Sequence, residues 1–112
     1  MNDAAAAGLD DTLAALADPL RRRAVELLAK RPLRAGELAR ELRTTPSTMS
    51  KHLRVLRHHG LVTETHPDFD ARVRIYALRS APMTALRSWL DNAERGWAEQ
   101  LTAFAAHLER EP

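Results

Sequence analysis

The chain has 112 residues, 45% of them hydrophobic, which suffices for one domain with a core but not for two. It contains no cysteine, so disulfides, thiolate metal sites and cysteine redox switches are excluded. No run approaches the ~18 consecutive apolar residues of a membrane span, and the start lacks the basic-then-apolar order of a secretory signal. We therefore expect a cytoplasmic protein without a membrane partner, folded as a single domain over residues 1–112 with residues 1–8 disordered.

The formal net charge of +2 hides an uneven distribution along the chain. Residues 1–18 carry four acidic and no basic residues, residues 19–79 carry fourteen Lys or Arg against six acidic residues, and residues 80–112 carry three against five. Clustered Lys and Arg replace the counterions condensed on nucleic-acid phosphates, although arginines are also common on solvated surfaces. The basic central segment therefore fits two interpretations, nucleic-acid binding and an ordinary solvated surface.

The first third of the chain predicts three short helices. The first carries leucines every three or four residues and is interrupted at Asp18-Pro19, because proline disfavours helical geometry in the residue before it. The same pair then begins the second helix, with the aspartate as N-cap and the proline as first helical residue. That helix is expected to extend to about Lys30, and a third is predicted over residues 35–42.

A fourth helix is predicted from residue 46 to residue 59, and its exposed residues carry most of the information about function. Thr45-Pro46 repeats the cap-and-proline start, and Gly60 favours a left-handed C-terminal cap. The major groove of DNA admits one helix, and small hydroxyls and cations on its first turns can reach bases and phosphates. The residues predicted to do so are Thr45, Ser47, Thr48, Ser50, Lys51, His52 and Arg54.

After Gly60 the hydrophobic period changes from about 3.6 to 2 residues. Residues 72–77 alternate as a half-buried strand does, residues 61–65 are the expected partner strand, and the turn-rich segment between them closes a hairpin. Arg72 and Arg74 lie on one side of the second strand, where we expect them to contact the DNA backbone or the minor groove. The fold class predicted is mainly α with a small β-hairpin: a winged helix-turn-helix of five helices and a two-stranded wing.

The last predicted helix, over residues 83–109, has a near-heptad apolar stripe and both tryptophans of the chain. So much apolar surface favours a twofold homodimer, helped by the first helix; the alternative is that the helix folds back on its own core. The predicted dimer residues are Leu9, Leu13, Leu16, Leu86, Trp89, Leu90, Trp97, Leu101, Phe104 and Leu108.

Three segments together, ALADPLRRRAVELL, ELARELRTTPSTMSKHLRVLRHHGLV and DARVRIYAL, resemble the ArsR (ArsR/SmtB-like) type of winged-helix repressor. The resemblance covers about residues 10–108 and is most specific from Pro46 to Val62. It implies a homodimer, built on the first and last helices, that represses promoters and releases double-stranded DNA when an effector binds; a twofold dimer is expected to read a palindromic operator. By the same resemblance, the residues that map onto the recognition helix are Ser47, Thr48, Ser50, Lys51 and His52.

Many members of that family sense metals, but this chain lacks their standard sites. The helix before the turn has no cysteine at residues 37–42, and neither register of the last-helix motif, anchored at Asp91 or at His107, supplies a ligand set. We therefore predict no metal site and no cofactor, with the effector unknown. A nonstandard site around His58, His59 and His66 remains an alternative, although the favoured interpretation is that they cap the helix C-terminus.

Two other function classes compete with DNA binding. An enzyme is disfavoured, because there is no Gly-rich phosphate loop, no cysteine nucleophile and no paired carboxylate motif. A winged-helix protein-interaction module is the stronger alternative, since fold alone does not fix function. Such a module would carry aromatic or aliphatic anchors on the exposed face of the fourth helix, which here is polar and cationic.

Overall fold

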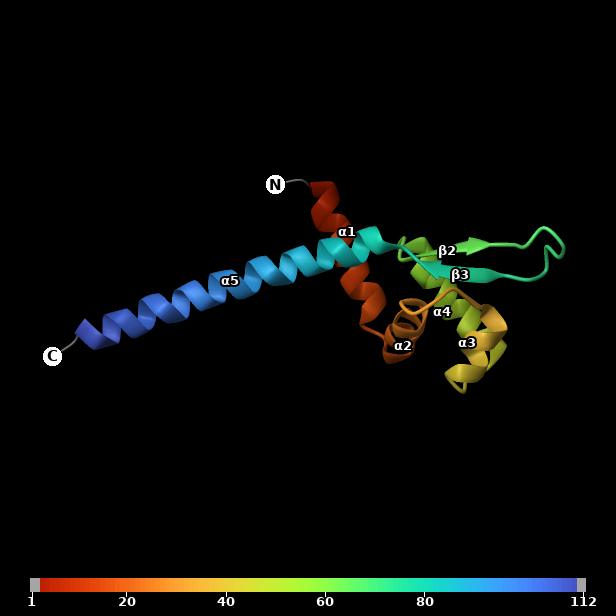
Figure 1. Cartoon of the computed structure of the whole chain (residues 1–112), viewed down its shortest axis with the longest axis horizontal. Coiled ribbons are helices and arrows are strands. Elements are labelled where there is room, and N and C mark those ends of the chain that lie inside the picture. Colours follow the sequence, from red (N-terminus) through yellow and green to blue (C-terminus); the bar gives the residue numbers. More distant parts are fainter. Residues whose placement is uncertain (1–2, 111–112) are drawn as a thin grey trace.

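The computed structural model describes the backbone of residues 3–110 and the side chains of residues 8–110. Within that range lie five helices and three strands: α1 (Asp3–Leu16), α2 (Pro19–Leu28), β1 (Leu33–Arg34), α3 (Ala35–Glu41), α4 (Pro46–His58), β2 (Val62–Thr65), β3 (Ile75–Leu78) and α5 (Ser80–Arg110) (Figure 1). The mainly helical fold with a small antiparallel sheet is the one that the sequence predicts.

The predicted helix boundaries are confirmed where side chains cap them. The Asp18 carboxylate accepts two backbone N–H bonds, at 2.8 and 3.1 Å, from the first turn of α2, and Thr45 accepts the backbone N–H of Thr48 at 3.1 Å at the start of α4. Gly60, with φ of 76°, follows the C-cap of α4 in the left-handed region. Helix α2 ends at Leu28 rather than near Lys30, because the chain then turns toward β1.

The core lies where α2, α3 and α4 pack against one another and against the sheet. Met49, Leu53 and Leu56 of α4 are buried, as their spacing predicts. The largest fully buried side chains are Tyr76, Leu38, Met49, Leu53, Leu56 and Leu61. One face of α4 is therefore held in the core, which leaves its opposite face for solvent or a partner.

A tight turn joins α3 to α4. Arg43 takes a left-handed conformation with φ of 53°, and the backbone N–H of Thr44 bonds to the carbonyl of Ala39 at 3.0 Å. This bond satisfies one of the carbonyls that the end of α3 leaves without a helical partner. The two helices are thereby held at a fixed angle, in the helix-turn-helix arrangement that the sequence predicts.

The wing differs from the prediction in two respects. The sheet has three strands in the order β1-β3-β2 instead of two, because Leu33–Arg34 pairs antiparallel with β3. The second wing strand covers Ile75–Leu78 rather than residues 72–77, and it pairs with β2 from Val62 opposite Leu78 to Thr65 opposite Ile75. Arg72 and Arg74 therefore precede β3, and the expectation that they lie on the strand is wrong.

Helices α1 and α5 form the other end of the molecule. Helix α1 begins at Asp3, and alanine, which has the highest helix propensity, fills positions 4–7. Of the segment 1–8 that we expected to be disordered, residues 1 and 2 lie outside the described range. Helix α5 packs on α1 near its start and then extends away from the body (Figure 1), giving overall extents of 74 × 31 × 20 Å. None of the helices described combines the length and apolar character that a membrane crossing requires.

Candidate nucleic-acid interface

The outward face of α4 is polar and cationic. Ser47, Lys51 and Arg54 are exposed along it, while Thr48 is half-buried at its edge. Thr45 precedes them as the N-cap, and its hydroxyl donates to the Thr48 hydroxyl at 2.9 Å. The predicted groove-reading residues at positions 45, 47, 48, 51 and 54 are thus brought together along the first three turns of one helix.

Ser50 lies at the edge of that face next to the wing. Arg74 donates through Nη2 to the Ser50 hydroxyl at 3.0 Å, which connects the base of the wing to α4. Between them is a hollow of about 260 Å³ lined by Ser50, Arg54, Arg57, Glu64, Arg74 and Tyr76. The sequence predicts that Arg74 contacts the DNA backbone from the wing; the structure shows that Arg74 links the wing to α4.

A carboxylate at the wing base organises this hollow. Tyr76 donates its hydroxyl to Glu64 Oε2 at 2.6 Å, and Arg57 Nη1 lies 3.4 Å from the same oxygen. The hydrogen bond from Tyr76 lowers the pKa of Glu64, with further lowering by Arg57, while burial and the bond to Glu64 raise the pKa of Tyr76 to about 12. Tyr76 therefore stays a neutral hydrogen-bond donor at physiological pH. The Glu64 carboxylate on β2 contacts both Tyr76 on β3 and Arg57 on α4, so it connects the two wing strands to that helix.

Arg72 is almost fully exposed, with 93% of its side chain accessible. The Asp70 carboxylate accepts the Arg72 backbone N–H at 2.9 Å and its Nε at 3.2 Å. The backbone bond from Arg72, followed by the side-chain bond, lowers the pKa of Asp70. Since the carboxylate partly neutralises the guanidinium, Arg72 offers less net positive charge to a phosphate than its exposure alone indicates.

A second hollow, of about 370 Å³, lies between α3 and the wing and was not predicted. It is lined in part by Arg34 and Arg40 from the α3 side and by Arg72 and Arg74 from the wing. Glu37 is the acidic residue of this lining, and it accepts the backbone N–H of Arg34 at 3.0 Å. Residues 34 and 74 meet here because β1 pairs with β3, a two-residue strand that hydrophobic periodicity does not reveal.

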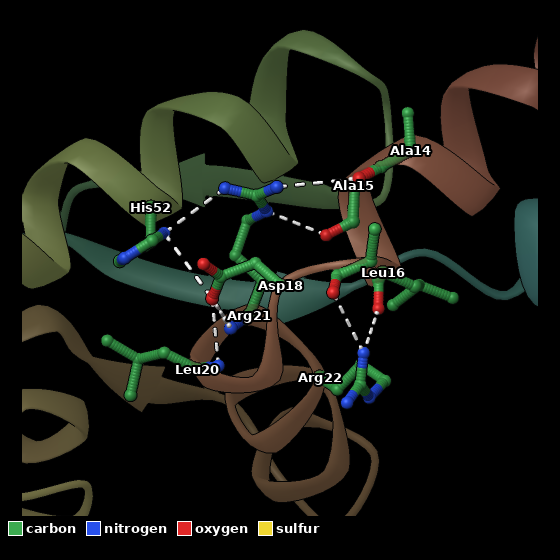
Figure 2. Close-up of polar contacts among 9 residues, drawn as sticks. Ala14, Ala15, Leu16, Asp18, Leu20, Arg21, Arg22 and His52 are labelled. Carbon is green, nitrogen blue, oxygen red and sulfur yellow. Dashed lines mark hydrogen bonds and ion pairs between the residues drawn. The ribbon is translucent and has the colours of Figure 1, made fainter.

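His52 is the predicted contact that the structure places least favourably for reaching DNA. Its ring lies against α2, with 20% of the side chain exposed, and its Nδ1 is 3.3 Å from Arg21 Nη1 and 4.0 Å from Asp18 Oδ1 (Figure 2). The backbone N–H of Arg21 is the main cause that lowers the pKa of Asp18, and nearby positive charge contributes. Sequence reasoning missed this cluster because His52 is 31 residues from Arg21.

The remaining histidines do not converge on a common site. His59 Nδ1 lies 3.6 Å from Asp11 Oδ1 on α1, whereas His66 Nε2 lies 3.3 Å from Glu64 in the wing. Among the described residues, no three His, Cys, Asp or Glu side chains are grouped so that they could hold a metal ion. The alternative of a nonstandard site formed by His58, His59 and His66 thus lacks a ligand set.

The apolar stripe predicted to form the dimer is solvent-facing in the single chain. Leu13, Trp89, Leu90, Trp97, Leu101, Phe104 and Leu108 are 42–61% exposed. Leu9, Leu16 and Leu86 are half-buried, and Leu16 packs against the core. Beyond its first turns, where Met83 packs against the core and the helix contacts α1, helix α5 does not fold back on its own core. The rest of its apolar face has no partner within the described part of the chain.

A helix-turn-helix pair closed by a small antiparallel sheet, with a polar, cationic second helix beside a basic wing, defines a winged-helix regulatory protein. The family model for bacterial regulatory proteins of the arsR family matches residues 18–64. Over 97 residues the chain is 40% identical to the HTH-type transcriptional regulator Rv2034 of Mycobacterium tuberculosis, covering 87% of this chain and 85% of that protein. The chain belongs to the ArsR family and is a transcriptional regulator, not an enzyme.

Solved structures agree with this assignment. An ArsR-like transcriptional regulator from Rhodococcus sp. RHA1 is similar with a TM-score of 0.77 at 26% identity, over 94% of this chain and 96% of the other. The crystal structure of an ArsR family transcriptional regulator, RHA00566, gives a TM-score of 0.71 at 30% identity, over 81% and 91% of the two chains. The resemblance found in the sequence and the predicted winged fold are thus confirmed.

Proposed function

We propose that this regulator binds double-stranded DNA sequence-specifically as a homodimer, with α4 in the major groove and the wing against the adjacent backbone. The observation that carries the proposal is the exposed face of α4, which presents hydroxyls and cations beside an arginine-rich wing and no apolar anchor. A protein-docking surface is expected to present aromatic or aliphatic anchors instead. The proposed contacts are Thr45, Ser47, Thr48, Ser50, Lys51, Arg54, Arg72 and Arg74; His52, which the sequence also suggested, lies against α2 and is not among them.

The positions of these side chains suggest different tasks. Lys51 and Arg54 are exposed on the groove-facing side of α4, where Lys and Arg recognise the O6 and N7 acceptors of guanine. Arg74 and Arg34, around the hollow between α3 and the wing, suit phosphates, because contacts to the DNA backbone fix register without reading sequence. Sequence preference is therefore assigned to α4, and much of the salt-dependent affinity to the wing side.

The apolar face of α5 supports the homodimer. Two copies related by a twofold axis would cover each other's Trp89, Trp97 and Phe104, and would present two recognition helices to successive turns of DNA. Such a dimer would read a palindromic operator. In the bacterial cytoplasm, a regulator bound over a promoter would act as a repressor. No cofactor is required for this reading.

The test compares DNA binding by three variants in fluorescence anisotropy at several salt concentrations. Lys51→Ala should lose about 1–3 kcal/mol of discrimination between a preferred site and one with a single altered base pair. Arg74→Ala should weaken binding to all duplexes about equally and lower the salt slope by about one unit. Arg95→Ala is the matched control, since this exposed arginine lies on α5, on the side of the helix away from the apolar stripe.

The results of this test distinguish a DNA-binding regulator from a protein-interaction module. If Lys51→Ala and Arg74→Ala both bind like the parent while the parent binds DNA, the surface assigned to DNA is wrong. If the parent shows only weak binding that salt abolishes, the basic segment is merely an electrostatic surface and the protein-interaction module is favoured.

A further inference from the structure

One arginine connects three helices at the corner where α1, α2 and α4 meet. Arg21, in the first turn of α2, donates through Nε to the carbonyl of Ala15 at 2.6 Å and through Nη2 to that of Ala14 at 3.4 Å. Its remaining Nη1 lies 3.3 Å from Nδ1 of His52 on α4 (Figure 2). The same guanidinium therefore caps the end of α1 and reaches the helix assigned to the major groove.

This contact requires one tautomer of the imidazole. A guanidinium can only donate, so a hydrogen bond from Arg21 needs Nδ1 of His52 as the acceptor, with the ring proton on Nε2. The Asp18 carboxylate, 4.0 Å from the same Nδ1, already accepts two backbone N–H groups of α2. Figure 2 shows the other ring nitrogen of His52 pointing away from both Arg21 and Asp18.

Arg22 provides an internal comparison. It also caps α1, donating through Nη1 to the carbonyls of Leu16 at 2.7 Å and Ala17 at 3.1 Å. Both arginines thus satisfy carbonyls that the C-terminal turn of α1 leaves unpaired, but within the cluster of contacts drawn in Figure 2 only Arg21 continues to α4. Capping of α1 and connection to α4 can therefore be separated by mutation.

We infer that Arg21 is a positioning residue for the recognition helix, and that His52 contributes to DNA binding mainly as the acceptor for Arg21 rather than by touching DNA. The inference rests on the proposed function, in which α4 enters the major groove. Helix α1 packs on α5, which carries the proposed dimer face. The Arg21–His52 bond is thus a direct polar connection from the dimer scaffold to the groove-reading surface, and it sets the orientation that two half-sites require.

Two substitutions of His52 separate positioning from DNA contact. In His52→Asn, the amide oxygen can occupy the place of Nδ1 and accept from Arg21, but nothing replaces Nε2. In His52→Gln, the longer side chain places its amide near the position of Nε2, but it removes the acceptor close to α2. Affinity for a duplex selected with the parent is measured by fluorescence anisotropy, and folding of both variants is checked by thermal unfolding.

If Arg21 positions α4 through His52, His52→Asn should bind the duplex within about twofold of the parent's affinity. His52→Gln should lose about tenfold or more in affinity. The opposite order, with the glutamine variant retaining affinity, would show that His52 touches DNA and would overturn the inference. Retained affinity in both variants would show that the connection is not needed, and loss in both folded variants would show that the imidazole itself is needed. Either of these results also overturns the inference.

A second measurement uses the free protein and does not depend on DNA. Nitrogen-15 NMR of the histidine side chains, at mildly alkaline pH, should show His52 with an unprotonated Nδ1 and a protonated Nε2. Arg22→Ala should preserve that tautomer, whereas Arg21→Met should give a mixture of tautomers. A proton on Nδ1 in the parent overturns the inference even if DNA binding is specific. If the expected tautomer is found but the parent selects no sequence, the proposed function fails instead.

Discussion

Replacing Trp97 by alanine should convert the proposed dimer into a monomer. In the single chain 61% of this tryptophan is exposed, and a large aromatic side chain can bury roughly 150–250 Å². A partner helix could therefore cover about 100–150 Å² of each Trp97, which corresponds to about 2.5–4 kcal/mol at ~25 cal/mol per Å². A twofold interface contains the residue twice.

The expected loss on dimerisation is therefore at most about 5–8 kcal/mol. The alanine side chain and incomplete coverage reduce this value, and about half of it, ~2.5–4 kcal/mol, raises the dimer dissociation constant by about sixtyfold or more. Sedimentation equilibrium over a range of protein concentrations measures this shift directly. Phe69→Ala is the matched control, because Phe69 is 79% exposed but lies in the wing hairpin, away from α5.

If Trp97→Ala sedimented as a dimer with the parent's dissociation constant, the apolar face of α5 would not be the interface. The same conclusion would follow if Phe69→Ala dissociated as readily as Trp97→Ala.

Three further predictions concern stability. Gly60→Ala should lower the free energy of unfolding by about 1–2 kcal/mol in urea titrations, because φ is 76° and the new Cβ would lie 3.0 Å from Arg79 Nη1; an unchanged midpoint would contradict this. Leu53→Ala, at a fully buried position, should cost about 2–5 kcal/mol by the same measurement, and a smaller loss would mean that the core collapses around it. Because the pKa of Glu64 is lowered on folding, its contribution is present above its ordinary value of 4.5 and lost as pH falls through the lower folded value. Glu64→Gln should accordingly flatten the acid side of the stability profile, with Tyr76 still neutral there; an equally steep acid loss would refute it.

The helices of the body were predictable because their signals are local. Asp18-Pro19 and Thr45-Pro46 each combine a capping side chain with a residue whose φ already suits a helix, and both start helices as expected. Gly60 likewise marks the end of α4 through its left-handed backbone. Each of these signals acts over a few residues and needs no knowledge of the tertiary fold.

The wing was less predictable because its pairing is not local. Leu33–Arg34 is too short to show any periodicity and becomes a strand only by pairing with residues 75 and 76. The alternation of residues 72–77 is real in the sequence, but strand pairing with β2 begins only at Ile75. Arg72 is instead held in the preceding turn by Asp70.

For the candidate site, the sequence identified which residues carry the chemistry but not how they are connected. The polar face of α4 follows from helical period alone. By contrast, the bond from Arg74 to Ser50 spans 24 residues and that from Arg21 to His52 spans 31, so neither can be read from spacing. His52 shows the consequence, since its helical position suggests a DNA contact whereas its ring packs against α2.

The central claim is sequence-specific DNA binding by a dimer, and selection from a random duplex pool at fixed physiological salt tests it most directly. The account predicts enrichment of a palindrome whose two half-sites have centres about ten base pairs, or a multiple of that, apart. Recovery of duplexes without a shared sequence, bound weakly and released by modest salt, would contradict it.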